Sequence, residues 1–126
     1  MGGAAAGEVA SRIAVEEVKS YFSQLQLPDI LHRDAIYRIL ERAFSQVHDV
    51  LLHETEKNEG LAGMGTTLTI GWFLWNQIYV AWVGDSRAYL YNRDGIVKTN
   101  EPKYRYCTEN LQILTDDHSL VWEIHS

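Results

Sequence analysis

Residues 66–83 hold two runs that alternate with the two-residue period of a β-strand, and this feature constrains the fold more than any other. In the second run, 77–83, both alternating sets of side chains are apolar, and the first run, 66–74, is similar. Trp75 and Asn76 between the runs are interpreted as a turn. The sequence therefore predicts a hairpin whose sheet is apolar on both faces, and such a sheet needs a cover on each side.

Two longer segments ahead of the hairpin carry apolar residues at spacings of three and four, which predicts helices over about residues 4–26 and about residues 31–58. Pro28 stops the first helix, Asp29 is a suitable cap for the second, and Gly60 ends it. A short connection favours antiparallel packing of the two helices. They can cover one face of the sheet, and the other face calls for a second sheet. The fold class is therefore α+β, in layers of helix, sheet, sheet and helix.

The chain beyond the hairpin predicts a further pair of strands and the start of a helix. A strand is expected over 87–91, followed by a turn at 92–95 with the Asp-Gly signature of a hairpin. The polar stretch 99–110 is interpreted as a loop, 111–115 as a short strand and 118–123 as the beginning of a helix. The second sheet that these elements contribute is incomplete, so residues 1–126 are expected to form a single incomplete domain.

Composition limits the class of protein. With 126 residues, 46% hydrophobic and 22% charged, the chain has the make-up of one globular domain. A net charge of -6 with scattered Lys and Arg argues against a nucleic-acid partner. No apolar run reaches the roughly 18 residues of a membrane span, and no secretory leader is recognised. The single cysteine, Cys107, forms no internal disulfide, so we expect a cytoplasmic protein.

Asp85 is the best candidate for a functional residue. It lies in a turn, Gly84-Asp85-Ser86, between two β-rich runs, where a carboxylate can face a site instead of a core. Such a carboxylate can bind Mg²⁺ or Mn²⁺, which take oxygen ligands and keep several waters. The alternative is that Asp85 only accepts backbone N–H bonds within its turn. Ser86 lies in a pattern close to a nucleophile elbow, but β-forming residues follow it, so we interpret it as a turn-stabilising hydroxyl.

Other polar residues favour structural interpretations. Thr67 is expected to satisfy backbone groups where the loop enters the strand. His53 begins a pattern like that of zinc proteases, yet Lys57 stands where the second histidine is needed. His118 follows two aspartates and is open to interpretation as a base, but an architectural role is favoured.

Three segments of this chain resemble the PP2C-type, metal-dependent serine/threonine protein phosphatases in their bacterial style. They are Gly63-Met64-Gly65-Thr66-Thr67, the run from Tyr79 through Gly84-Asp85-Ser86-Arg87-Ala88-Tyr89, and Leu114-Thr115-Asp116-Asp117-His118-Ser119. The resemblance implies a four-layer α-β-β-α sandwich, Mn²⁺ or Mg²⁺ as cofactor, and phosphoserine or phosphothreonine proteins as substrates. In that family the aspartate matching Asp85 lies by the metal centre and contributes to an additional, weaker metal site.

The resemblance covers roughly the middle half of such a domain. Met1-Gly2-Gly3 resembles the end of the first metal motif, Asp-Gly-x-Gly-Gly, so the Asp and Gly of that motif are missing. The later Ser-Asp-Gly and Gly-x-x-Asp-Asn segments are absent as well. We therefore expect a phosphatase domain truncated at both ends and inactive alone, with Asp85 as its one metal-ligand candidate and no further catalytic or cofactor-binding residue.

Two alternatives stay open. The chain can instead be a non-catalytic interaction or regulatory remnant that binds a partner, or a second copy of itself, through its uncovered sheet face. It can also be a product that folds poorly.

Overall fold

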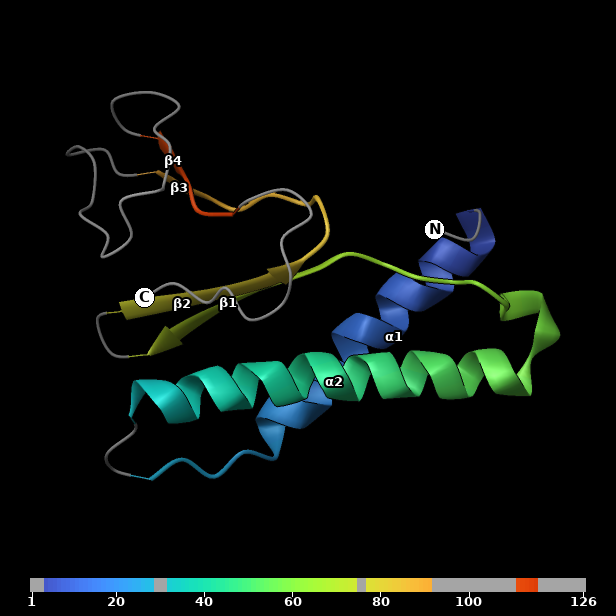
Figure 1. Cartoon of the computed structure of the whole chain (residues 1–126), viewed down its shortest axis with the longest axis horizontal. Coiled ribbons are helices and arrows are strands. Elements are labelled where there is room, and N and C mark those ends of the chain that lie inside the picture. The colour runs from blue at the N-terminus through green and yellow to red at the C-terminus, as the bar shows by residue number, and fades with distance from the viewer. Residues whose placement is uncertain (1–3, 29–31, 75–76, 92–110, 116–126) are drawn as a thin grey trace. The chain divides into compact units, whose positions relative to one another are not determined.

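The computed structural model of the chain describes residues 4–28, 32–74, 77–91 and 111–115. It has an α+β fold in which two helices precede the strands, as predicted (Figure 1). The chain divides into two compact units, Met1–Thr66 and Thr67–Ser126. The elements, in chain order, are α1 (Ala4–Ser23), α2 (Arg33–Lys57), the 3-10 turn η1 (Glu59–Leu61), β1 (Leu68–Leu74), β2 (Gln77–Val83), β3 (Tyr89–Tyr91) and β4 (Leu111–Ile113).

In the first unit, α1 and α2 pack together and run in broadly opposite directions, which confirms the predicted pairing (Figure 1). Ala6 and Ala10 of α1 form a buried cluster with Met64, and Leu51 of α2 packs against that cluster. The small alanines allow the neighbouring chain to approach closely. A hydrogen bond of 3.0 Å from Gln46 Nε2 to Glu17 Oε1 also joins the two helices. Within the described residues, no helix has the length and apolar character that crossing a membrane requires.

The helix boundaries differ from the predicted ones. Helix α1 ends at Ser23, three residues before the predicted end. Helix α2 begins at Arg33 with His32 as its N-cap, so the prediction of Asp29 as cap was wrong. The backbone of His32 is extended, and its carbonyl oxygen accepts the amide of Ile36 at 3.1 Å as the first bond of the helix.

The C-terminus of α2 is also set by a cap that was not predicted. The helix ends at Lys57, and the extended backbone of Asn58 stops it. The Asn58 side chain then accepts a hydrogen bond of 3.0 Å from the amide of Gly60, which lies within η1. Gly60 is therefore not the terminator, because the asparagine side chain offers the backbone an alternative to the helix two residues earlier.

The second unit contains the predicted hairpin. Strands β1 and β2 are antiparallel, with Leu68 opposite Val83 and Leu74 opposite Gln77, so two residues connect them as expected. Strand β2 has the predicted bounds, whereas β1 starts two residues later than predicted. The short strands β3 and β4 form a separate antiparallel pair in which Tyr89 lies opposite Ile113.

Both faces of β2 are buried, as its two apolar sets of side chains predicted. Tyr79 and Ala81 are buried on one face, and Val80 and Trp82 on the other. Val80 and Trp82 form a core cluster with Leu114, and partly buried residues around β3 pack against it. Ala88, Leu90 and Leu114, at and next to β3 and β4, therefore cover one face of the hairpin, where the sequence required a second layer.

Several expectations concern residues outside the described part of the chain. The turn at 92–95, the loop at 99–110 and the helix at 118–123 belong to this group. Cys107 and His118 lie there as well.

Candidate site at the Asp85 turn

The hairpin register places Asp85 at the point where the chain leaves the sheet. Because Leu68 is paired with Val83, the next residue outward on each strand is Thr67 on one side and Gly84 on the other. Gly84 has φ of 99°, a left-handed conformation that a glycine adopts without steric cost. Asp85 follows directly and is exposed, so its carboxylate is accessible to solvent and solutes. This is the turn-tip position that the sequence predicted.

Thr67 contacts the turn at two points. Its hydroxyl oxygen lies 2.6 Å from the hydroxyl oxygen of Ser86, and either group can donate the hydrogen bond. Its methyl group covers Gly84 so closely that a Cβ atom added at Gly84 would lie 2.5 Å from Thr67 Cγ2. The interpretation of Ser86 as a turn-stabilising hydroxyl is confirmed by this bond. From the sequence, the Thr67 hydroxyl was expected to form hydrogen bonds with backbone groups, and Ser86 was not predicted as its partner.

A second threonine holds the chain where it leaves the turn. The amide of Ala88 donates to Thr115 Oγ1 at 3.2 Å, and the amide of Leu114 donates to the Ala88 carbonyl at 2.9 Å. Thr115 is only 2% exposed, so its hydroxyl is held within the core. Sequence reasoning missed this role. A polar residue at the end of a short apolar strand gives no signal of its partner.

The described residues can supply one ligand to a metal site, but they do not form a complete site. Among them, no group of three His, Cys, Asp or Glu side chains comes together. The Asp85 carboxylate is an exposed, hard oxygen donor, and Mg²⁺ sites commonly use one or two protein carboxylates with waters in the remaining positions. Asp116 and Asp117 lie outside the described residues. Asp85 can therefore supply one oxygen to a divalent cation whose other ligands come from elsewhere.

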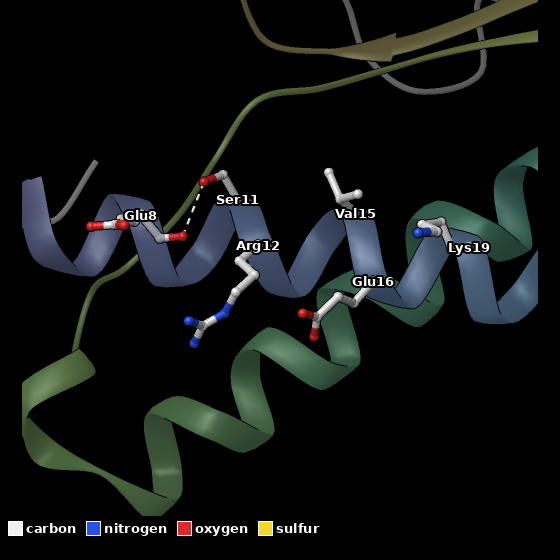
Figure 2. Close-up of a pocket in the computed structure, with 6 residues that line it drawn as sticks. All are labelled: Glu8, Ser11, Arg12, Val15, Glu16 and Lys19. Atoms are coloured by element: carbon white, nitrogen blue, oxygen red, sulfur yellow. Dashed lines mark hydrogen bonds between the residues drawn. The ribbon is translucent and has the colours of Figure 1, made fainter.

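The exposed face of α1 carries a surface hollow of ≈ 570 Å³ (Figure 2). The charges around it have both signs and follow helical spacing, which is typical of a solvated helix face. The Ser11 hydroxyl donates to the Glu8 carbonyl at 3.1 Å, a bond local to the helix. This hollow brings together no pair of groups suited to acid–base or nucleophilic chemistry. The residues that line it are Glu8, Ser11, Arg12, Val15, Glu16 and Lys19.

Comparison with known proteins places the chain in a family. The protein phosphatase 2C family matches residues 1–120. A serine/threonine phosphatase of Listeria innocua, named stp, is 32% identical over 98% of this chain and 42% of its own length. The serine/threonine protein phosphatase PstP of Mycobacterium tuberculosis is 36% identical over 75% of this chain and 17% of its own length. The protein phosphatase PhpP of Streptococcus pneumoniae is 29% identical over 98% of this chain and 43% of its own length.

The chain thus spans less than half the length of these relatives. No solved structure matches it. The family match extends over all three segments that carried the resemblance, and it includes the Asp85 turn. The chain therefore belongs to the protein phosphatase 2C family.

Proposed function

We propose that this chain is part of a metal-dependent phosphatase that removes phosphate from phosphoserine and phosphothreonine in proteins, with Asp85 as one oxygen ligand of its metal centre. The observation that carries the proposal is the family match over residues 1–120, which includes the exposed Asp85 turn. Both compact units are then parts of one incomplete phosphatase domain. We place the protein in the cytoplasm, which its single cysteine supports.

When bound, Mn²⁺ or Mg²⁺ would activate a water molecule for attack on the phosphoryl group. The contribution of this chain is to offer the Asp85 carboxylate and to hold it in place. Thr67 fixes the residues on either side of Asp85, and Thr115 fixes the exit of the turn at Ala88. A carboxylate that is held before the cation arrives loses less conformational freedom on binding than one on a mobile loop.

Residues 1–126 alone are expected to show no appreciable phosphatase activity, because no group of three potential metal ligands comes together in their described part. Titration of the purified chain with Mn²⁺ by calorimetry, together with an assay on p-nitrophenyl phosphate, tests this expectation. Tight binding with turnover would mean that further carboxylates of this chain complete a site. We expect the titration to show no tight binding of Mn²⁺ and the assay to show no turnover.

A chimera tests the phosphatase function itself. In it, this chain replaces the matching segment of the Listeria innocua phosphatase, and phosphate release from a phosphothreonine peptide is measured with and without Mn²⁺. We expect Mn²⁺-dependent activity, and we expect Asp85→Asn to raise the Mn²⁺ concentration that half-maximal activity needs. Asp49→Asn, at an exposed position on α2, is the matched control and should change nothing. A folded chimera without activity, beside an active Listeria protein, would contradict the proposal.

A non-catalytic role in binding a partner is the second candidate, and exposed aromatic side chains favour it. Phe73 of β1 is 77% exposed, and Tyr89 and Tyr91 of β3 are also exposed. Apolar side chains on uncovered strands are a common feature of interaction surfaces. Self-association through either of these exposed strands would appear in size-exclusion chromatography with light scattering as a mass that rises with concentration. Phe73→Ser should then lower that mass, whereas a monomer at all concentrations would count against the surface.

A further inference from the structure

The residues on either side of Asp85 are both held by the same side chain. Gly84 lies beneath the Thr67 methyl group, and Ser86 shares a 2.6 Å hydrogen bond with the Thr67 hydroxyl. Asp85 itself is exposed and lies between these two contacts. We propose that Thr67 is the positioning residue for Asp85, a role that rests on the proposed function of Asp85 as a metal ligand.

The argument depends on both branches of the threonine. The methyl branch closes the space above Gly84 and thereby limits how the backbone can move at its left-handed φ of 99°. The hydroxyl branch holds Ser86, two residues further along the turn. With both neighbours restrained, the Asp85 backbone keeps one conformation and only its side-chain torsions remain to be ordered when it binds a cation.

Thr67 is itself in a position to act as a fixed point. It directly precedes β1, whose first residue, Leu68, is paired with Val83 at the end of β2. Thr67 and Gly84 therefore both adjoin the same residue pair of the hairpin, Leu68 and Val83. The exit of the turn is held independently, by Thr115 at Ala88. Loss of the Thr67 hydroxyl should consequently loosen Asp85 and Ser86 while the rest of the sheet keeps its pairing.

The chain offers matched variants that separate the two branches. Thr67→Val keeps the branched shape and removes the hydroxyl, whereas Thr67→Ser keeps the hydroxyl and removes the methyl group. Ser86→Ala removes the other hydroxyl of the same hydrogen bond. Because Ser86 is exposed, this variant replaces Thr67→Val in the experiment if Thr67→Val fails to fold. Thermal unfolding by circular dichroism checks that each variant is folded.

The experiment uses nuclear magnetic resonance on the full 126-residue chain. Backbone order parameters of Asp85 and Ser86 are measured without metal, and line broadening at Asp85 is then measured with substoichiometric Mn²⁺. Broadening at Asp49, an exposed carboxylate on α2, is the internal reference for weak, unspecific binding. We expect a rigid turn and excess broadening at Asp85 in the unsubstituted chain. Thr67→Val and Ser86→Ala should lower the order parameters and reduce the excess broadening roughly fivefold. Thr67→Ser keeps the hydrogen bond and loses only the methyl contact, so it should lower the order parameters and the excess broadening by less.

The two possible failures give different results. If Thr67→Val and Ser86→Ala leave the turn rigid, or leave the excess broadening unchanged, Thr67 does not position Asp85 and the proposed metal ligand still stands. If Asp85 in the unsubstituted chain broadens no more than Asp49, and Asp85→Asn also leaves the Mn²⁺ dependence of the chimera unchanged, the proposed ligand role is wrong and the positioning role toward it is overturned as well. The order parameters measured without metal then show separately whether Thr67 restrains the backbone at Asp85 and Ser86.

Discussion

Substitution of Gly84 by alanine tests the geometry of the Asp85 turn most directly. Gly84 has φ of 99°, and a Cβ atom there would lie 2.5 Å from Thr67 Cγ2 and 3.0 Å from Thr67 Cβ. Both features are unfavourable for alanine, and they have separate physical causes. The positive φ strains any L side chain, whereas the short contact depends on the threonine across the hairpin.

The magnitude follows from these two causes. An L residue in a left-handed conformation costs roughly 1–2 kcal/mol. An overpacked contact that forces a shift of its neighbour costs about 1–3 kcal/mol more. We therefore expect Gly84→Ala to lower the free energy of unfolding by about 2–5 kcal/mol. Since whole domains are stable by only about 5–15 kcal/mol, a loss of this size should be evident in a single denaturation curve.

Urea denaturation followed by tryptophan fluorescence is the suitable assay, because all 4 tryptophans lie in the second unit. Gly71→Ala is the matched control. Its Cβ would lie 3.5 Å from Ile78 Cδ1, an ordinary contact, and it should change stability by no more than about 1 kcal/mol. Thr67→Ser removes the methyl carbon Cγ2. In a Thr67→Ser background, Gly84→Ala should therefore lower the free energy of unfolding by less, because the contact with that carbon is gone.

Two results would refute this reasoning. Equal stability of Gly84→Ala and Gly71→Ala would show that the turn is not strained by a side chain at Gly84. A loss that is the same with Thr67→Ser as with threonine would show that the methyl contact contributes nothing.

Three further predictions concern the core and the helices. Trp82→Ala should lower the free energy of unfolding by about 3–5 kcal/mol in urea denaturation followed by circular dichroism, because Trp82 is fully buried. Thr69→Val should raise that free energy by roughly 1–2 kcal/mol, since the buried Thr69 Oγ1 has no hydrogen-bond partner among the described residues, and Thr69→Ser should give no gain. Burial raises the pKa of Tyr21 above its ordinary value of 10.0, and the charge of Arg42 opposes the rise. The folded state thus disfavours the phenolate, so this contribution to stability is complete below the ordinary pKa and is lost as pH rises through the folded pKa. Tyr21→Phe should therefore show a smaller loss of stability between about pH 9 and about pH 11, measured from urea midpoints.

The regular elements could be predicted from the sequence because their periodicity is local. Strand β2 has the predicted bounds, since seven residues alternate without interruption between two turn-forming segments. The ends of α2 could not be predicted in the same way. His32 and Asn58 cap that helix through their extended backbone conformations, and the pattern of apolar residues does not report those conformations.

The candidate site was predictable in its position and not in its contacts. A glycine between two β-rich runs indicated that Asp85 lies at a turn tip, and the structure confirms this. The residues that hold the turn are distant in sequence, with a separation of 19 from Thr67 to Ser86 and of 27 from Ala88 to Thr115. Hydrogen bonds of this range depend on strand pairing, which no single stretch of the sequence specifies.

The strand register is the link between the hairpin connection and the site. Two residues connect Leu74 to Gln77, and this length pairs Leu68 with Val83 at the far end. That pairing brings Thr67 to Gly84. Because successive residues of a strand point to opposite faces, a register shifted by one residue would present Leu68 or Thr66 to the turn from the opposite face. The position of Asp85 therefore depends on a connection at the other end of the sheet, seven residue pairs away.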